Sequence, residues 1–120
     1  MAGKVKAKKS LDSVEKILQL VKNSLDDGKA EDVIIIDLEG KSSIASYMVV
    51  ASGNSNRHVA SLAENLQMKL KQNGHQSIAE GLEKADWVLI DAFDVVVHIF
   101  RPEVREFYSL EKMWSAIVRN

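Results

Sequence analysis

Asp91 and Asp94 are the pair of residues whose type and spacing come closest to a catalytic arrangement in this chain. Paired carboxylates hold the two metal ions of nucleotidyl-transfer enzymes, which stabilise the reacting oxygens. Here the two residues flank a predicted loop instead of alternating along a strand, and no Gly-Ser-x-x-Asp element precedes them. A metal-dependent nucleotidyl-transfer enzyme is therefore the alternative interpretation, and we expect a protein without catalytic residues.

The three histidines fall on different predicted elements: His58 at the start of a helix, His75 in a loop and His98 in a strand. Their spacing is not that of metal ligands, and a structural hydrogen-bonding role is the more common one. The chain also contains no cysteine, which excludes disulfides, thiolate chemistry and cysteine-based zinc sites. We therefore expect neither a metal nor another cofactor.

Two glycine-containing turns have some features of phosphate-binding loops. Gly40-Lys41-Ser42 matches the end of a P-loop, but that pattern needs a glycine where Ile35 stands, and a predicted strand follows the turn instead of a helix. The turn at Gly53-Asn54-Ser55, with Arg57 nearby, precedes a predicted helix whose free N–H groups could hold an anion. Capping of that helix by Ser55 explains the same residues without a ligand, and we favour it.

A predicted hairpin carries the two carboxylates. Runs of β-branched residues on either side of Ala92-Phe93 indicate neighbouring antiparallel strands. A two-residue loop would pair Asp91 with Asp94, Leu89 with Val96, and Trp87 with His98. Because strand side chains alternate, these residues would share one face, too polar for a core and too apolar for plain solvent surface. The opposite face is apolar and predicts core; it holds Val88, Ile90, Val95, Val97 and Ile99.

The rest of the chain predicts helices and strands in alternation. Apolar residues at helical spacing predict an amphipathic helix from its N-cap Ser10 to Gly28, packed on a sheet or forming a dimer seam; they are Leu11, Val14, Leu18, Val21 and Leu25. The β-branched run from Asp32 to Leu38 is typical of a strand covered on both faces. The further predicted elements are a strand over 44–52, a short strand over 75–79, a helix from Pro102 and a last helix from Ser109 through Trp114 and Ile117. Between the first two strands, a helix ended by Asn73-Gly74 is predicted to carry Val59, Leu62, Ala63, Leu66 and Leu70 on one side.

This order predicts an α/β domain with a mixed sheet of about five strands and flanking helices. The strand-helix-strand unit from Ser46 to Ala79 is expected to form a right-handed parallel crossover. At 120 residues, the chain is long enough for one domain with a single core. We expect that domain over 10–120, after a mobile basic tail over 1–9.

Charge is unevenly distributed along the chain. The first ten residues contain four lysines and no acid, although the net charge of the whole chain is only -1. Between Glu80 and Glu111, eight acidic residues face three basic ones, which disfavours nucleic acid and favours basic protein partners. No apolar run approaches the roughly 18 residues of a membrane span, so a cytoplasmic location without membrane contact is expected.

Several of these segments resemble the Iojap family, the bacterial ribosomal silencing factors RsfS. The resemblance covers residues 11–115 and depends on motifs in the same order and spacing. They are Gly40-Lys41-Ser42-Ser43, Asn56-Arg57-His58-Val59, Glu80-Gly81, Asp86-Trp87-Val88, Asp91, Asp94-Val95-Val96-Val97-His98, Arg105, Phe107-Tyr108, Leu110-Glu111 and Trp114. One departure is Phe93, where the family usually has glycine, so the hairpin loop could be longer than two residues.

This resemblance implies a nucleotidyltransferase-like fold and a regulatory function. The family binds the large ribosomal subunit through the basic ribosomal protein L-fourteen, blocks subunit joining sterically, lowers translation when nutrients are short, and forms homodimers off the ribosome. Such a function needs no catalytic residue, cofactor, membrane or specific nucleic acid. An obligate homodimer that shares the mixed hairpin face is a second alternative.

Aromatic and acidic residues around the hairpin are the candidate partner-binding residues. Trp87 and Tyr108 are of the types that anchor protein interfaces. Acidic residues would complement a basic ribosomal protein, although Arg105 could instead pair with them inside the chain. We keep Phe107 and Trp114 as core residues. The predicted set is Glu80, Gly81, Trp87, Leu89, Asp91, Asp94, Val96, His98, Arg105 and Tyr108.

Overall fold

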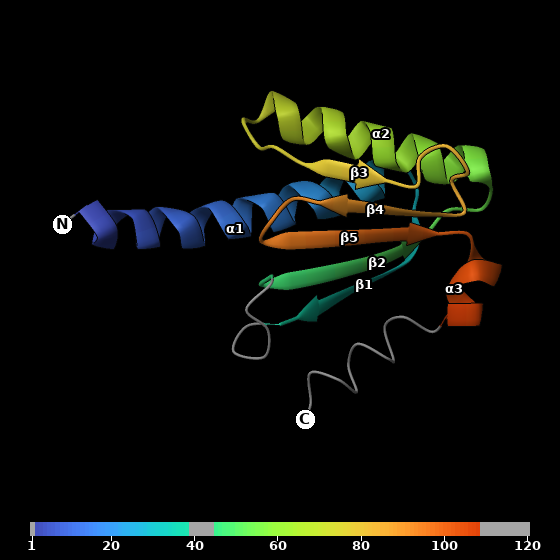
Figure 1. Ribbon diagram of the computed structural model, residues 1–120, viewed down its shortest axis with the longest axis horizontal. Helices are drawn as coiled ribbons and strands as arrows, with labels where there is room; N and C mark the ends of the chain where they lie inside the picture. Colours follow the sequence, from blue (N-terminus) through green and yellow to red (C-terminus); the bar gives the residue numbers. More distant parts are fainter. Residues whose placement is uncertain (1, 39–44, 109–120) are drawn as a thin grey trace.

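The computed structural model describes the backbone of residues 2–38 and 45–108, and the side chains of 14–38 and 45–105 (Figure 1). The elements are α1 (Ala2–Asp27), β1 (Glu31–Asp37), β2 (Tyr47–Ser52), α2 (Asn56–Gln72), β3 (Ile78–Glu80), β4 (Trp87–Asp91), β5 (Val95–Phe100) and α3 (Pro102–Tyr108). The predicted turn at Gly40-Lys41-Ser42, the last helix from Ser109 and the side chains of Phe107, Tyr108 and Trp114 lie outside these residues.

The strands form one mixed sheet in the order β1-β2-β5-β4-β3, which confirms the predicted α/β class. β2 pairs parallel with β5, and the other three neighbouring pairs are antiparallel. It follows that β2 and β3 run in the same direction, so α2 is a parallel crossover that passes over β5 and β4. Its handedness stays a prediction.

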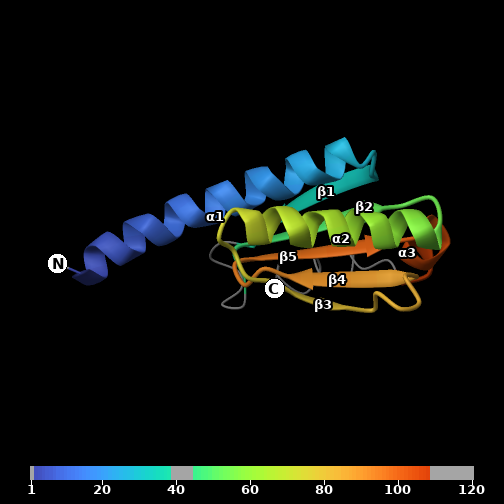
Figure 2. The ribbon, with the colours of Figure 1, turned by 90° about the horizontal axis from the view of Figure 1, so that it is seen from above.

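α1 and α2 contact each other and cover one face of the sheet (Figure 2). The five apolar hairpin residues that predicted core, from Val88 to Ile99, are all fully buried on this face. The apolar stripe of α2 is buried as well and consists of Val59, Leu62, Ala63, Leu66 and Leu70. Burial at roughly 25 cal/mol per Å² of apolar surface is the main favourable contribution to the stability of such a layer.

α1 begins earlier than its stripe predicted. The helix extends from Ala2 to Asp27, so Ser10 is an interior residue and not its N-cap. Alanine and lysine dominate the first turns, and both have high helix propensity, which explains why no break occurs at Ser10. Mobility of residues 1–9 stays a prediction. Among the side chains that the structure describes, Val14, Ile17, Val21 and Leu25 are buried and Leu18 is partly buried.

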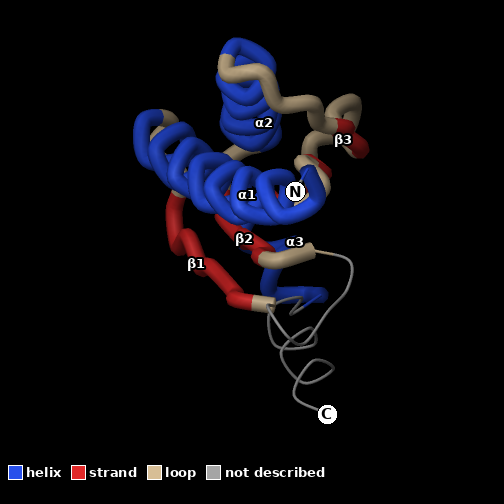
Figure 3. The backbone as a smooth tube through the Cα atoms, turned by 90° about the vertical axis from the view of Figure 1, so that its left-hand side faces the viewer, coloured by secondary structure: helices blue, strands red, loops and turns tan. Residues whose placement is uncertain are grey.

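The prediction that β1 is covered on both faces is wrong. β1 lies at the edge of the sheet, and six of its seven residues are exposed (Figure 3). A continuous β-branched run identifies a strand, but it carries no information about which strands or helices will cover it. Among the described residues, the core beneath α1 and α2 contains side chains of β2, β4 and β5 and none of β1.

The hairpin has the predicted faces but a different register. Trp87 pairs with Phe100, Leu89 with His98, and Asp91 with Val96, so each partner is two residues later than predicted. The N–H of Ala92 donates to the carbonyl of Val95 at 3.0 Å, which places Phe93 and Asp94 in the turn. Phe93 adopts φ +70°, the conformation for which glycine is preferred. A shift of two residues preserves the side-chain alternation, so the predicted division into faces is confirmed.

Candidate partner-binding face

The second face of the sheet carries the predicted binding residues of the hairpin. We call it the open face and define it by Trp87, Leu89, Asp91, Val96 and His98, all of which are partly exposed. The cross-strand pairs arrange them in rows with neighbours from β2 and β1. One row contains Ile34, Val50, His98 and Leu89, and the next contains Ile36, Met48, Val96 and Asp91. Among the described helices, only α3 packs on this face, at one end, through Val104.

Three rings form a cluster on the open face. Trp87 donates its indole N–H to Nδ1 of His98 at 3.0 Å. Trp87 also stacks on Phe100 with ring centroids 4.9 Å apart, and Phe100 itself is fully buried. The indole is therefore fixed from two sides although part of it reaches the surface. A rigid, partly exposed tryptophan loses little side-chain entropy when a partner binds it.

The hydrogen bond from Trp87 determines which ring nitrogen of His98 carries the proton. Because Nδ1 accepts from Trp87, the proton of the neutral ring lies on Nε2. Desolvation by burial lowers the pKa of His98 from 6.5 to about 4. At neutral pH, the open face therefore presents an uncharged imidazole, and its acidic residue is Asp91.

Asp91 and Asp94 belong to different parts of the hairpin. Asp91 ends β4 on the open face, and its carboxylate accepts a hydrogen bond from the N–H of Phe93 at 2.8 Å. Asp94 lies in the turn, where its carbonyl accepts from the N–H groups of Ser46 and Tyr47. The predicted cross-strand pairing of the two residues is wrong, because the turn is centred one residue later. Within residues 14–38 and 45–105, no group of three or more histidines and carboxylates is arranged to hold a metal ion.

Glu80 and Gly81 lie beside the open face at the sheet edge opposite β1. Glu80 is exposed at the end of β3 and pairs with Leu89. Gly81 has φ +88°, and a Cβ atom on it would collide with the carbonyl oxygen of Trp87. Glycine is therefore required at this position on two grounds, and it allows the chain to pass directly over the start of β4.

Arg105 does not lie on the binding surface, where the sequence had placed it. Its side chain is buried, and its guanidinium donates to the carbonyl of Asp32 at 2.7 Å and to the hydroxyl of Ser52 at 2.8 Å. The prediction that Arg105 pairs inside the chain is closer to the structure, but these two acceptors are not the acids of the hairpin. Arg105 attaches α3 to the β1-β2 edge of the sheet.

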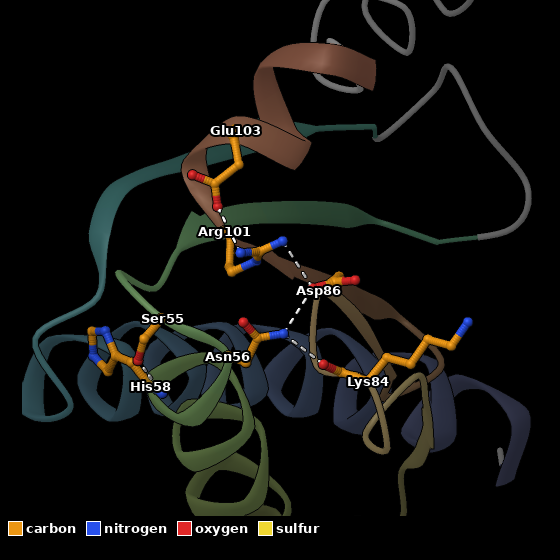
Figure 4. Close-up of polar contacts among 7 residues, drawn as sticks. All are labelled: Ser55, Asn56, His58, Lys84, Asp86, Arg101 and Glu103. Carbon is orange, nitrogen blue, oxygen red and sulfur yellow. Dashed lines mark hydrogen bonds and ion pairs between the residues drawn. The ribbon is translucent and has the colours of Figure 1, made fainter.

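A polar network at one end of the sheet was not predicted (Figure 4). Asp86 accepts from the side-chain amide of Asn56 at 2.7 Å and forms an ion pair with Arg101 at 3.0 Å. Arg101 also contacts Glu103 at 3.2 Å. This network ties the start of α2 to the start of β4 and the end of β5. Asn56 and Asp86 stand in segments that the sequence singled out, but no spacing rule could bring residues thirty positions apart together.

The start of α2 is built as predicted. Ser55 is the N-cap, and its hydroxyl accepts from the N–H of His58 at 3.0 Å. The His58 ring accepts from the N–H of Asn54 through Nδ1 at 2.9 Å, and its Nε2 contacts the carbonyl of Gly28 at 2.8 Å. Ser55 thus supplies an acceptor to the first turn of α2 from the chain itself, which favours the capping interpretation of this turn over an anion site.

A groove of about 850 Å³ lies next to Trp87. Leu82, Val104 and Trp87 contribute apolar walls, and the charged lining residues are Glu83, Lys84, Asp86 and Glu103. Three of the four charges are negative. The groove and the open face share Trp87, so one bound partner could contact both surfaces.

Comparison with known proteins agrees with this fold. The family model described as "Ribosomal silencing factor during starvation", RsfS, matches residues 11–120. The chain belongs to the RsfS family. It is 54% identical over 102 residues to the ribosomal silencing factor RsfS of Zymomonas mobilis, with 84% of this chain and 77% of the relative covered.

A structural and a more distant relative extend the comparison. A crystal structure of a protein from Chromobacterium violaceum superposes with a TM-score of 0.82 at 42% identity, covering 85% of this chain and 86% of that one. The mouse protein named "Mitochondrial assembly of ribosomal large subunit protein 1" is 32% identical over 91 residues, 72% of this chain and 40% of its own length. The RsfS family is thus one of ribosome-associated regulators, which agrees with a non-enzymatic role. No helix within the described residues is long and apolar enough to span a membrane.

Proposed function

We propose that this RsfS-family protein binds the large ribosomal subunit through ribosomal protein L-fourteen and prevents the small subunit from joining. The observation that carries the proposal is the partly exposed Trp87, fixed by His98 and Phe100 on a face that also carries Asp91. A rigid aromatic residue beside carboxylates suits a basic protein surface, because the ring supplies contact area and the acids supply orientation. The name of the mouse relative supports the large subunit as the partner.

Obstruction of joining follows from size and location alone. The folded chain measures 48 × 37 × 21 Å along its principal axes. If it occupies a surface that the small subunit must contact, the two subunits cannot associate while it is bound. Translation then falls in proportion to occupancy, and affinity determines potency. Such a regulator acts in the cytoplasm when nutrients are short, and it needs no catalytic step.

The residues that we assign to the interface are those of the open face together with Glu80, Gly81, Asp94 and Tyr108. Gly81 contributes by its backbone path and not by a side chain. The proposal includes a homodimer of the free protein, as the family resemblance implies. Sedimentation with separated subunits tests the proposal: the protein should migrate with purified large subunits and not with small ones, and substitution of Trp87 should remove it from that fraction.

A further inference from the structure

The outer edge of β1 carries exposed aliphatic side chains. Val33, Ile34 and Ile35 are 39%, 40% and 37% exposed, and among the described residues no strand pairs with this edge. Natural proteins protect edge strands with charges, prolines or bulges. β1 has a bulge only at its beginning, between Glu31 and Ile34, so the stretch that follows stays regular and paired with β2.

The ladder indicates which backbone groups of β1 point outward. The N–H of Leu38 donates to the carbonyl of Ser46 at 2.8 Å, so this pair is hydrogen-bonded. Because such pairs alternate along an antiparallel ladder, Ile36 and Ile34 also turn their backbone groups toward β2. The N–H and C=O of Ile35 consequently point away from the sheet. They offer a donor and an acceptor to a further strand.

Charge identifies the occupant. The exposed carboxylates Glu31 and Asp32 begin β1, and Asp37 ends it. The aliphatic centre suits an extended segment with apolar residues at its middle, and the acidic ends favour basic residues on either side of that middle. A second copy of β1 fits less well, because antiparallel pairing would bring the acidic start of one strand toward the acidic end of the other.

We propose that the edge of β1 is a strand-addition site for an extended protein segment with an apolar centre and basic flanks, which pairs with the backbone of Ile35 as a sixth strand. Arg105 supports the site from inside, since it fixes the carbonyl of Asp32 at the bulge, where Asp32 has φ +48°. The inference does not depend on the ribosomal function. It concerns backbone pairing at an edge, whereas the proposed function depends on side chains of the open face.

The test uses two synthetic peptides, Lys-Lys-Val-Thr-Val-Thr-Val-Lys-Lys and the same sequence with glutamate in place of every lysine. Their binding to the full-length protein is followed through the backbone amide signals in nuclear magnetic resonance, at peptide concentrations up to a few millimolar. We expect the basic peptide to shift the Ile35 amide and its neighbours saturably and the acidic peptide to bind at least tenfold more weakly. Equal binding of both peptides, or no shift with the basic one, would overturn the proposal.

Three variants separate backbone pairing from side-chain contact. Ile35→Pro removes the outward N–H without removing a bond to β2 and should abolish binding, whereas Ile35→Thr keeps that N–H and should retain it within about threefold. Glu31→Lys, which changes only an exposed charge, should weaken the basic peptide at least tenfold even if Ile35→Pro fails to fold. Two results would contradict the assignment of this edge to a foreign segment. One is a wild-type dimer that Ile35→Pro converts to a monomer. The other is an Ile35 amide that is already protected from hydrogen exchange in the free monomer.

Discussion

The indole N–H of Trp87 donates to Nδ1 of His98 across the hairpin at 3.0 Å, although the two residues are not directly opposite each other. Trp87 pairs with Phe100 and His98 with Leu89, so the hydrogen bond runs diagonally. Diagonal neighbours on one face of an antiparallel pair lie within reach of large rings. The bond couples two residues of the open face, and it forms only when Nδ1 is unprotonated.

Stability should depend on the protonation of His98. Burial lowers its pKa from 6.5 to about 4 in the folded protein, so the unfolded chain binds the proton more tightly. The stabilising effect of the neutral ring is complete above pH 6.5 and is lost as the pH falls toward 4, by at most about 3 kcal/mol. Urea unfolding of the wild type and of His98→Gln between pH 4 and 7 measures it. Parallel curves for the two proteins would show that His98 contributes nothing, because the variant retains every other titratable group.

Gly81→Ala should destabilise the protein more than Gly74→Ala. Both glycines have positive φ, +88° and +81°, so alanine is strained at either position by about 1 kcal/mol. Only at Gly81 would the added Cβ also meet the carbonyl oxygen of Trp87, whereas nothing lies within 4 Å at Gly74. We expect a total loss of about 3 kcal/mol in the free energy of unfolding for Gly81→Ala, from the backbone strain and the steric collision together. Equal losses would mean that the chain moves away from β4 without cost.

Ser55→Ala should cost about 1 kcal/mol of folding free energy, because the N–H of His58 loses its acceptor at the start of α2. Ser61→Ala is the matched control, since Ser61 is exposed in the interior of the same helix, and its effect should stay within about 0.5 kcal/mol. Denaturant titration followed by helical circular dichroism gives both values. A Ser55 variant as stable as the Ser61 variant would contradict the capping role.

Arg105→Leu should reduce stability by about 2 kcal/mol or more, because the carbonyl of Asp32 and the hydroxyl of Ser52 lose a charged donor. Arg57→Leu, on the exposed surface of α2, should change it by less than about 0.5 kcal/mol. Both proteins, when folded, should bind large subunits like the wild type. Selective loss of subunit binding in a stable Arg105 variant would return this residue to the interface.

Periodicity was sufficient to predict the division of the hairpin into two faces, because side-chain alternation survives a register shift of two residues. It was also sufficient for the buried stripe and the cap of α2, which are local features. The register itself depended on whether Phe93 accepts a positive φ, which its residue type disfavours. The turn propensities of Phe93 and Asp94 therefore did not predict that these two residues form the turn.

Features that depend on residues far apart in the chain could not be predicted from the sequence. The β-branched run of β1 identified a strand, but its edge position is set by pairing with β2 alone. Arginine is usually a surface residue, so the sequence placed Arg105 at the surface. Its burial depends on hydrogen-bond acceptors 73 and 53 positions away in the chain. The network of Asn56, Asp86 and Arg101 similarly connects three elements through single contacts, for which a sequence carries no periodic signal.

Binding of Trp87→Ala to purified large ribosomal subunits tests the central claim most directly. Met68→Ala is the matched control, because Met68 is 50% exposed on α2, which covers the other face of the sheet. Quantitative co-sedimentation, with folding checked by circular dichroism, should show wild type and Met68→Ala bound to large subunits and not to small ones. Trp87→Ala should bind at least about thirtyfold more weakly, a loss of about 2 kcal/mol. A folded Trp87→Ala protein that co-sediments as well as the wild type would contradict the account.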